Sequence, residues 1–358
     1  MISTEVVVIG EILGRWDSPV ASTEERENMT RTLGEIASGF DCQFMDYDGR
    51  SHPLKVQWLR TPQEYLPLDK IREPLIHEPM MPPSFIKFTC RLEYTDEYID
   101  GYLTPSDPAD DHRIPRYDVE QLIATDTSKD LAGVFLDTVI AANIARLGSL
   151  NYTRIFHFVD DELKAVDDGI RGIPGDVTDQ AIERGWPTFN ELSVHQVARW
   201  LYGVPRFLSR ESSTRLGRAL AAASHILTSN WSWSELDLAW ALLGLEALYA
   251  DGNSGLQQQL ADKTEVFLGR RATHKSGMSS MYNFRSRFLH GDIDLLYAHN
   301  LHNQSDRYTR IQNPLYESEF TAIAVLFSTL QRMCMENRYE LRFGYQVHDR
   351  PDSENAAR

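Results

Sequence analysis

The sequence predicts an α+β protein in which a β-rich N-terminal region precedes an all-α helical bundle. Two observations support this fold class. In residues 85–94, apolar and polar side chains alternate with the period of two that a half-buried strand shows. From about residue 207 onward, apolar residues recur at helical spacing in one segment after another. The change of period along the chain indicates that strands and helices are segregated.

The bulk composition is that of a folded, water-soluble chain. Its 358 residues are more than one typical domain needs, and its 42% hydrophobic content supplies ample core material. The net charge of −16 argues against binding nucleic acid over the whole surface. Cys42, Cys90 and Cys334 are too few and too scattered for a disulfide framework, which favours a reducing, cytoplasmic location. No secretory signal or membrane-spanning segment is expected.

Changes in composition divide the chain into four expected segments. The acidic, proline-containing stretch at 104–116 ends the β-rich part. The expected segments are a β-rich N-terminal domain (1–125), a mixed linker region (126–205), a helical domain (206–340) and a C-terminal tail (341–358).

Local patterns predict the elements of the first two segments. Strands are expected near residues 6–9, 42–47, 54–59, 85–94, 98–103 and 153–159, with a helix at 128–148. The proline cluster at 74–83 predicts a loop. The Gly-, Pro- and Asp-rich stretch at 166–190 predicts a loop with at most a short helix.

The helical domain is expected to be a bundle of four or five helices. Their ranges are 209–228, 232–250, 256–269, 277–291 and 316–338. Ser232 and Glu235 form a capping-box pattern before the second of these helices. The last helix has one apolar face with a period of about 3.6 residues.

The fourth of these helices holds a candidate catalytic motif, Tyr282-Asn-Phe-Arg285-Ser-Arg-Phe-Leu-His290-Gly291. An Arg followed by a His five positions later is a weak pattern alone, because residues 72–77 also fit it. That second copy contains Pro74 and lies in the proline-rich loop. The copy at Arg285 lies in a predicted helical bundle and in a segment, 266–291, that carries five Lys or Arg and no acidic residue.

The motif and its setting resemble the Apea-like family of HEPN ribonucleases. The resemblance covers residues 206–340 and includes Trp240, the stretch Leu245–Tyr249, Phe267-Leu268 and then the motif, in that order. It implies a HEPN-type helical bundle that acts as a metal-independent endoribonuclease with no cofactor. It also implies a homodimer through this domain and an effector or toxin role in anti-phage defence by abortive infection. The N-terminal region would then be a sensor or regulatory part that answers a partner or a phage-derived trigger.

The chemistry that this resemblance implies suits the residues. RNA carries its own nucleophile, the ribose 2′-hydroxyl, and the imidazole of His290 can take its proton as a general base. Arg285 can stabilise the charge that builds on the phosphoryl oxygens, and Ser286 can position the phosphate or the imidazole. The products would carry 2′,3′-cyclic phosphate and 5′-hydroxyl ends.

Supporting residues are expected around this pair. A buried carboxylate on an apolar helix needs a partner, so Glu246 is expected either to pair with Arg285 or Arg287 or to lie at the rim of the bundle and reach water. Tyr282 and Asn283 are candidates to contact a base or ribose, although Tyr282 can equally pack inside the bundle. Four further cations are candidates to hold RNA phosphates, each of which can instead be a plain surface residue: Arg270, Arg271, Lys275 and Arg287.

Alternatives remain open at this point. The helical domain can be a non-catalytic HEPN module for dimerisation or RNA binding, although a scaffold needs neither Arg285 nor His290. A weaker alternative puts an enzyme in the N-terminal region, where no phosphate loop or nucleophile motif occurs. His299 and His302 make a poor metal pair without a third ligand, so no metal site is expected.

Overall fold

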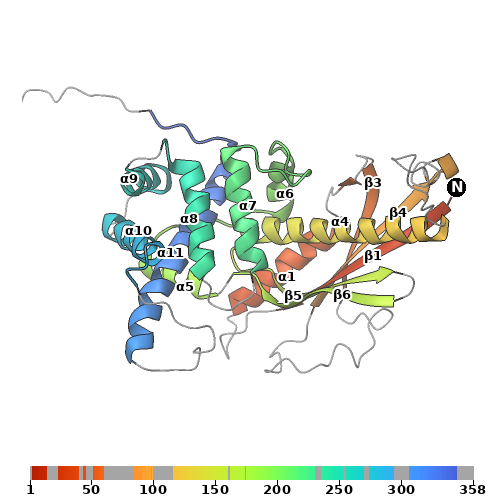
Figure 1. Cartoon of the computed structure of the whole chain (residues 1–358), viewed down its shortest axis with the longest axis horizontal. Helices are drawn as coiled ribbons and strands as arrows, with labels where there is room; N and C mark the ends of the chain where they lie inside the picture. The colour runs from red at the N-terminus through yellow and green to blue at the C-terminus, as the bar shows by residue number, and fades with distance from the viewer. Residues whose placement is uncertain are drawn as a thin grey trace, which may run out of the picture.

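A computed structural model describes residues 2–13, 23–39, 43–45, 51–59, 84–97, 99, 116–159, 162–173, 175–229, 235–252, 255–269, 274–293 and 306–344. An antiparallel sheet with two covering helices forms one end of the molecule, and a group of helices forms the other (Figure 1). The protein is therefore α+β, as the sequence predicts. None of the helices within these ranges is long and apolar enough to cross a membrane.

The sheet has six strands in the order β2-β3-β4-β1-β5-β6. Their bounds are β1 (Ile2–Leu13), β2 (Gln43–Met45), β3 (Ser51–Leu59), β4 (Ser84–Tyr94), β5 (Asn151–Val159) and β6 (Glu162–Arg171). The N-terminal strand β1 lies at the centre and pairs antiparallel with β4 and β5, so that Val8 is opposite Phe88 and His157. The strongest predicted strand, 85–94, is thus confirmed as β4.

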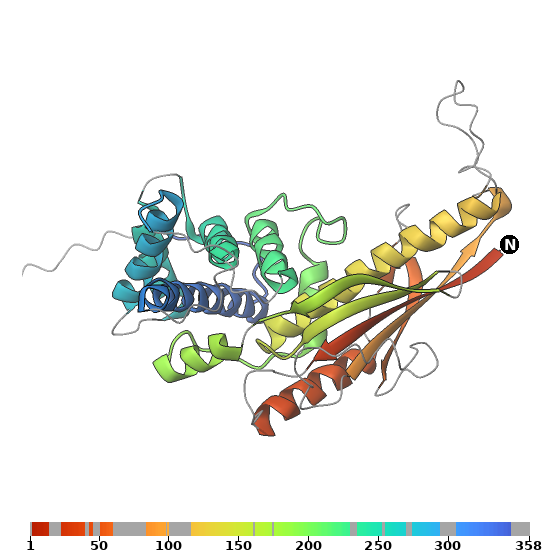
Figure 2. The same ribbon diagram turned by 60° about the horizontal axis from the view of Figure 1, so that its bottom comes forward.

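Helix α4 (Arg116–Ala145) lies along the sheet and continues into the helical end of the molecule (Figure 2). Its Phe135 ring sits over Gly10 of β1, where a Cβ atom would lie 2.1 Å from the ring. The same ring meets Phe88 and Tyr152 edge-on, at 6.1 and 5.3 Å between centroids. A glycine at position 10 is therefore needed for this helix to approach the central strand. Helix α1 (Thr23–Ala37) joins the same core.

The helical end consists of α5 (Gly175–Arg184), α6 (Val194–Tyr202), α7 (Arg215–Thr228), α8 (Glu235–Tyr249), α9 (Leu256–Leu268), α10 (His274–Leu289) and α11 (Asp306–Met335). Helix α11 packs against α4, α5, α8, α9 and α10, and residues 322–331 of it are buried without interruption. One apolar core extends from Val8 in the sheet through Phe135 to Phe327. The sheet and the helices therefore fold around a shared core.

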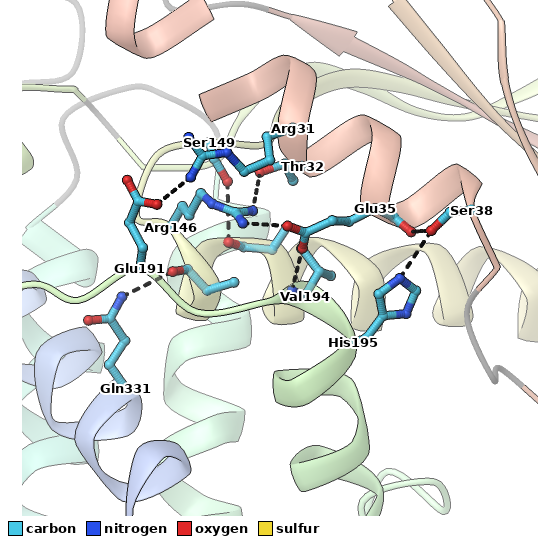
Figure 3. Close-up of polar contacts among 12 residues, drawn as sticks. Arg31, Thr32, Glu35, Ser38, Arg146, Ser149, Glu191, Val194, His195 and Gln331 are labelled. Carbon is cyan, nitrogen blue, oxygen red and sulfur yellow. Dashed lines mark hydrogen bonds and ion pairs between the residues drawn. The ribbon is translucent and has the colours of Figure 1, made fainter. Parts of the chain in front are cut away.

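A polar network centred on Arg146 joins the two ends of the molecule (Figure 3). The buried guanidinium of Arg146 donates to Thr32 Oγ1 at 3.0 Å and to Glu35 Oε1 at 2.5 Å, both on α1. The second carboxylate oxygen of Glu35 accepts from the backbone N–H of Val194, 2.7 Å away, at the start of α6. Gln331 of α11 donates to the carbonyl of Ala145 at 3.3 Å. Arg146 and Glu35 together thus connect the end of α4 to α1 and α6. The bond from Gln331 connects the end of α4 to α11.

The structure differs from the expected domain boundaries. The boundary between residues 125 and 126 does not hold, because it falls inside α4. The expected linker, 126–205, supplies β5, β6, α5 and α6 instead. Its Gly, Pro and Asp residues suggest a linker, but the pairing of β6 with β5 and the shared core override that composition. The helical part begins before residue 206, since α6 belongs to it.

Several element predictions also need correction. Ile99 is helical, so the strand expected at 98–103 is not present at that described position. Helix α11 begins at Asp306 and runs through Pro314, a residue that normally ends a helix, which is why the pattern favoured a start at 316. The loops expected at 74–83 and 104–115 lie outside the described residues. Cys90 and Cys334 are buried and are in no disulfide within the described residues, and Cys42 is outside the described part.

Candidate active site at the end of helix α10

The C-terminus of α10 places His290 at the point where the helix stops. The backbone N–H of His290 still donates to the Ser286 carbonyl at 3.0 Å, and that of Asp292 reaches back to Arg287 at 2.8 Å. Gly291 between them has a φ of +78°, the left-handed conformation that ends many helices. This hydrogen-bond pattern makes His290 the capping residue, and it is exposed. The helix end predicted at Gly291 is confirmed.

Arg285 lies one turn earlier and is held by a partner on α8. Its Nη1 is 3.6 Å from Glu246 Oε1, and its guanidinium carbon is 5.5 Å from the centre of the Tyr282 ring. The Tyr282 hydroxyl donates to the same Glu246 oxygen at 2.9 Å. Glu246 was expected to pair with Arg285 or Arg287, and the structure pairs it with Arg285. Residues two apart project about 200° apart on a helix, so Arg287 points away from α8.

The ion pair leaves the arginine open to a ligand. The side chain of Arg285 is 25% exposed and that of Glu246 is 17% exposed. The guanidinium has five N–H donors in a fixed plane, and the contact with Glu246 involves one of its terminal nitrogens. An arginine anchored at one nitrogen can still present donors to a phosphate.

Tyr282 serves this anchor as a hydrogen-bond donor. Partial burial raises the pKa of Tyr282 to about 12, and the hydrogen bond to the Glu246 carboxylate contributes to that rise by favouring the protonated form. The phenol therefore keeps its proton at neutral pH and fixes the carboxylate that in turn faces Arg285. Its hydroxyl contacts Glu246, and of the two roles predicted for it the structure favours packing inside the bundle.

Helix α8 is itself rigidly placed. A Cβ atom at Gly244 would lie 3.0 Å from Leu326 of α11 and 3.3 Å from Ala222 of α7, so α8 approaches both helices closely there. Leu245 and Leu248, on either side of Glu246 in sequence, are buried. Glu246 is thus presented from the core-facing helix and not from a loop, which restricts where Arg285 can lie.

The remaining predicted residues are placed as follows. Ser286 is half-buried, while Asn283 and Arg287 are exposed on α10. Lys275 lies in the first turn of α10, with a side chain outside the described part, and Arg270 and Arg271 lie outside the described residues altogether. Of the candidate RNA-binding cations, only Arg287 therefore has a side chain that the structure describes.

Two serine–histidine contacts elsewhere have the wrong polarity for a nucleophile. Ser128 donates its single hydroxyl proton to the Thr125 carbonyl at 2.7 Å, so the Nδ1 of His157, 2.9 Å away, must be the donor in their contact. Ser38 likewise donates to the Glu35 carbonyl, and His195 is the donor to it (Figure 3). A catalytic serine needs a histidine that accepts its proton.

The described residues contain no cluster of potential metal ligands. Among those residues, no group of three or more His, Cys, Asp or Glu side chains is placed to hold an ion. His299 and His302 lie outside them.

A buried acidic residue that the motif analysis did not single out lies in a cavity of about 230 Å³ between α4 and α7. Asp137 pairs there with Arg210, which crosses α4 at Gly133. Burial raises the pKa of Asp137 to about 6, against the opposing effect of Arg210. The only sequence signal is that Asp137 interrupts the apolar stretch 131–147.

A second unforeseen cavity, of about 270 Å³, lies beside the N-terminal half of α10. Helices α5 and α11 form its other walls. Its α5 residues come from the stretch that was expected to be mostly loop, so no local pattern pointed to it.

Comparison with known proteins assigns neither a family nor a function to this site. The chain matches no protein-family model, no curated protein and no solved structure. The likeness to the Apea-like HEPN family therefore depends on the motif at Arg285 and His290 and on the order of the residues around it.

Proposed function

We propose that this chain is a metal-independent endoribonuclease of the HEPN type. The observation that carries the proposal is the anchored guanidinium of Arg285, held by Glu246 one turn before an exposed histidine at the end of the same helix. RNA cleavage by its own 2′-hydroxyl needs at least a cation that can bind the phosphate and a group that can accept the 2′-hydroxyl proton, and Arg285 and His290 are exposed enough to supply one each.

The reaction follows from the chemistry of these groups. His290 takes the proton of the ribose 2′-hydroxyl, and O2′ then bonds to the adjacent phosphorus. Arg285 stabilises the negative charge on the phosphoryl oxygens with its planar donors. The bond from phosphorus to O5′ breaks, and that oxygen takes a proton from water or from a second imidazole. The products carry 2′,3′-cyclic phosphate and 5′-hydroxyl ends.

A second copy of the chain supplies that second imidazole in our proposal. Positions five apart in a helix are about 140° apart, so Arg285 and His290 of one chain do not face the same direction. An isologous dimer would place two such pairs around one groove. By the same analogy, the enzyme acts in the cytoplasm as an anti-phage effector, and the sheet end restrains it until a trigger binds.

The test is cleavage of end-labelled RNA with EDTA present. We expect wild type to cut and to leave cyclic phosphate ends, and His290→Ala and Arg285→Ala to lose at least about a hundredfold in rate. Arg218→Ala, which removes an exposed arginine on α7, is the matched control and should cut normally. Equal cutting by all four proteins would refute the assignment, and RNA binding without cutting would favour a scaffold.

A further inference from the structure

The cavity beside α10 combines an apolar wall with polar side chains. Its volume is about 270 Å³, and it lies between α5, α10 and α11. The apolar wall includes Trp186, Met278, Met281 and Phe320. The indole N–H of Trp186 donates to the Gly269 carbonyl at 3.2 Å, so the ring is held in place. Aromatic and sulfur-containing walls of this kind suit a heterocycle.

Polar groups of both kinds face this wall. The Gln180 carbonyl oxygen is buried and has no hydrogen-bond partner among the residues that the structure describes. Arg184 donates from one nitrogen to Thr321 Oγ1 at 2.8 Å, which uses one of its five N–H donors. Glu317 also lines the cavity. The site therefore offers acceptors from Gln180 and Glu317 and donors from Arg184.

These groups match a nucleobase better than a phosphate. A carboxylate at Glu317 repels an anion, and a buried acceptor without a donor is stabilised by a ligand N–H. Guanine alone among the RNA bases combines two adjacent N–H groups, at N1 and N2, with an O6 acceptor beside them. Arginine is the side chain that most often reads O6 and N7 of guanine.

We propose that this cavity binds a guanine base of the RNA that the enzyme cuts, so that Gln180, Arg184 and Glu317 set its sequence preference. This inference rests on the proposed ribonuclease function. Met281, in the cavity wall, precedes Arg285 by about 6 Å and His290 by about 14 Å along the axis of α10, from the rise per residue of a helix. Nucleotides adjacent to the bound guanine would then reach the cleavage groups.

Direct binding tests the cavity without requiring cleavage. Full-length protein carrying His290→Ala is titrated with GMP, AMP, CMP and UMP, and binding is followed by intrinsic tryptophan fluorescence and calorimetry. We expect GMP to bind at least about tenfold more tightly than the others, the scale of one arginine–guanine contact. Binding of all four nucleotides with equal affinity, or of none, would overturn the proposal.

Substitutions in the cavity test whether GMP binds there. Arg184→Ala should weaken GMP binding at least about tenfold. Ser280→Trp should abolish it by filling the cavity from an exposed position on α10, without removing a core residue. Arg199→Ala, an exposed arginine on α6, is the matched control. Unchanged GMP binding in both cavity variants would refute the site.

The two proposals fail separately. If RNA is cut but GMP does not bind, the base pocket is wrong and the ribonuclease stands. If GMP binds as expected but RNA is not cut, the pocket stands without the ribonuclease. In active protein, Ser280→Trp should flatten the guanine preference around mapped cleavage sites.

Discussion

In our proposal, the contact between Arg285 and Glu246 serves function more than folding. A partly exposed ion pair at 3.6 Å contributes at most about 1 kcal/mol to the free energy of unfolding. Its main effect is to fix the direction of the guanidinium, helped by the Tyr282 hydroxyl. An interaction that positions a charge should affect the rate of phosphate chemistry more than stability.

Glu246→Gln tests that distinction. The amide keeps the size of the carboxylate and can still accept from Tyr282, but it removes the charge that faces Arg285. We expect RNA cleavage to fall about tenfold while the free energy of unfolding changes by less than about 1 kcal/mol. Urea denaturation and single-turnover cleavage measure the two effects. A loss of stability with unchanged cleavage would mean that Glu246 is merely structural.

Asp137 predicts a pH dependence of stability. Burial raises its pKa from 3.8 to about 6, so the folded protein holds this proton more tightly than the unfolded chain does. The stability that this group contributes is therefore full below about pH 4 and is lost as the pH rises to about 6. Asp137→Asn removes this loss. The stability of the variant relative to wild type should rise by on the order of 2–3 kcal/mol between these pH values.

Urea denaturation of both proteins at several pH values measures that difference. Other carboxylates, including the buried Asp237, titrate in both proteins and cancel in the comparison. Asp137→Asn removes the attraction to Arg210 only at pH values where Asp137 is ionised in wild type, and that attraction is already contained in the folded-state pKa of about 6. Parallel stability curves would show that Asp137 titrates normally in the folded state.

At the scale of single elements, the end of α10 depends on one glycine. Gly291 has a φ of +78°, and beyond its chain neighbours no atom of the described residues lies within 4 Å of the place that a Cβ would take, so the substitution meets backbone strain there. Gly291→Ala should cost about 1 kcal/mol and should reduce cleavage by displacing His290. Gly34→Ala, inside α1 with equally open surroundings, should stabilise by roughly 0.5–1 kcal/mol and leave cleavage unchanged. Identical effects of the two changes would contradict the capping role.

Elements differ in how far the sequence predicts them. The sequence of β4 alternates between apolar and polar residues, so its range is predicted almost to the residue, although burial alternates only from Cys90 to Tyr94 and the strand is buried on both faces at Phe85–Phe88. Strand β6 carries Asp167, Asp168 and Gly169, which disfavour strands, and only its pairing with β5 at the sheet edge reveals it. The sequence narrows the environment of Glu246 to a pair with Arg285 or Arg287 or to water at the rim, and the structure shows the pair with Arg285. The cavity beside α10 could not be predicted, because its lining residues come from three segments far apart in sequence.

At the scale of the whole molecule, Arg146 is a buried polar link between the end of α4 and α1, and its partner Glu35 extends this link to α6 at the helical end. The Arg146 side chain is 6% exposed, and its loss would leave Glu35 without this cation and Thr32 without this donor. Arg146→Ala should lower the free energy of unfolding by about 3 kcal/mol, the usual effect of breaking a buried pair. Arg31→Ala removes a neighbouring but exposed pair with Glu191 and should cost less than about 1 kcal/mol. Equal effects in urea denaturation would deny Arg146 this role.

The shared core also predicts that the helical part that carries Arg285 and His290 cannot be separated from the rest of the chain at residue 206. Beyond α11, the chain returns to α6, where Tyr339 stacks on Trp200 at 6.1 Å and the Trp200 indole donates to the Arg338 carbonyl at 3.1 Å. A fragment of residues 206–344 lacks both α6 and α4 and would expose the apolar faces that pack on them. We expect it to bind hydrophobic dyes and to show no cooperative thermal transition, whereas the full chain melts cooperatively. A cooperatively folded, RNA-cutting fragment would mean that the sheet end is a removable regulator and not part of the enzyme's own core.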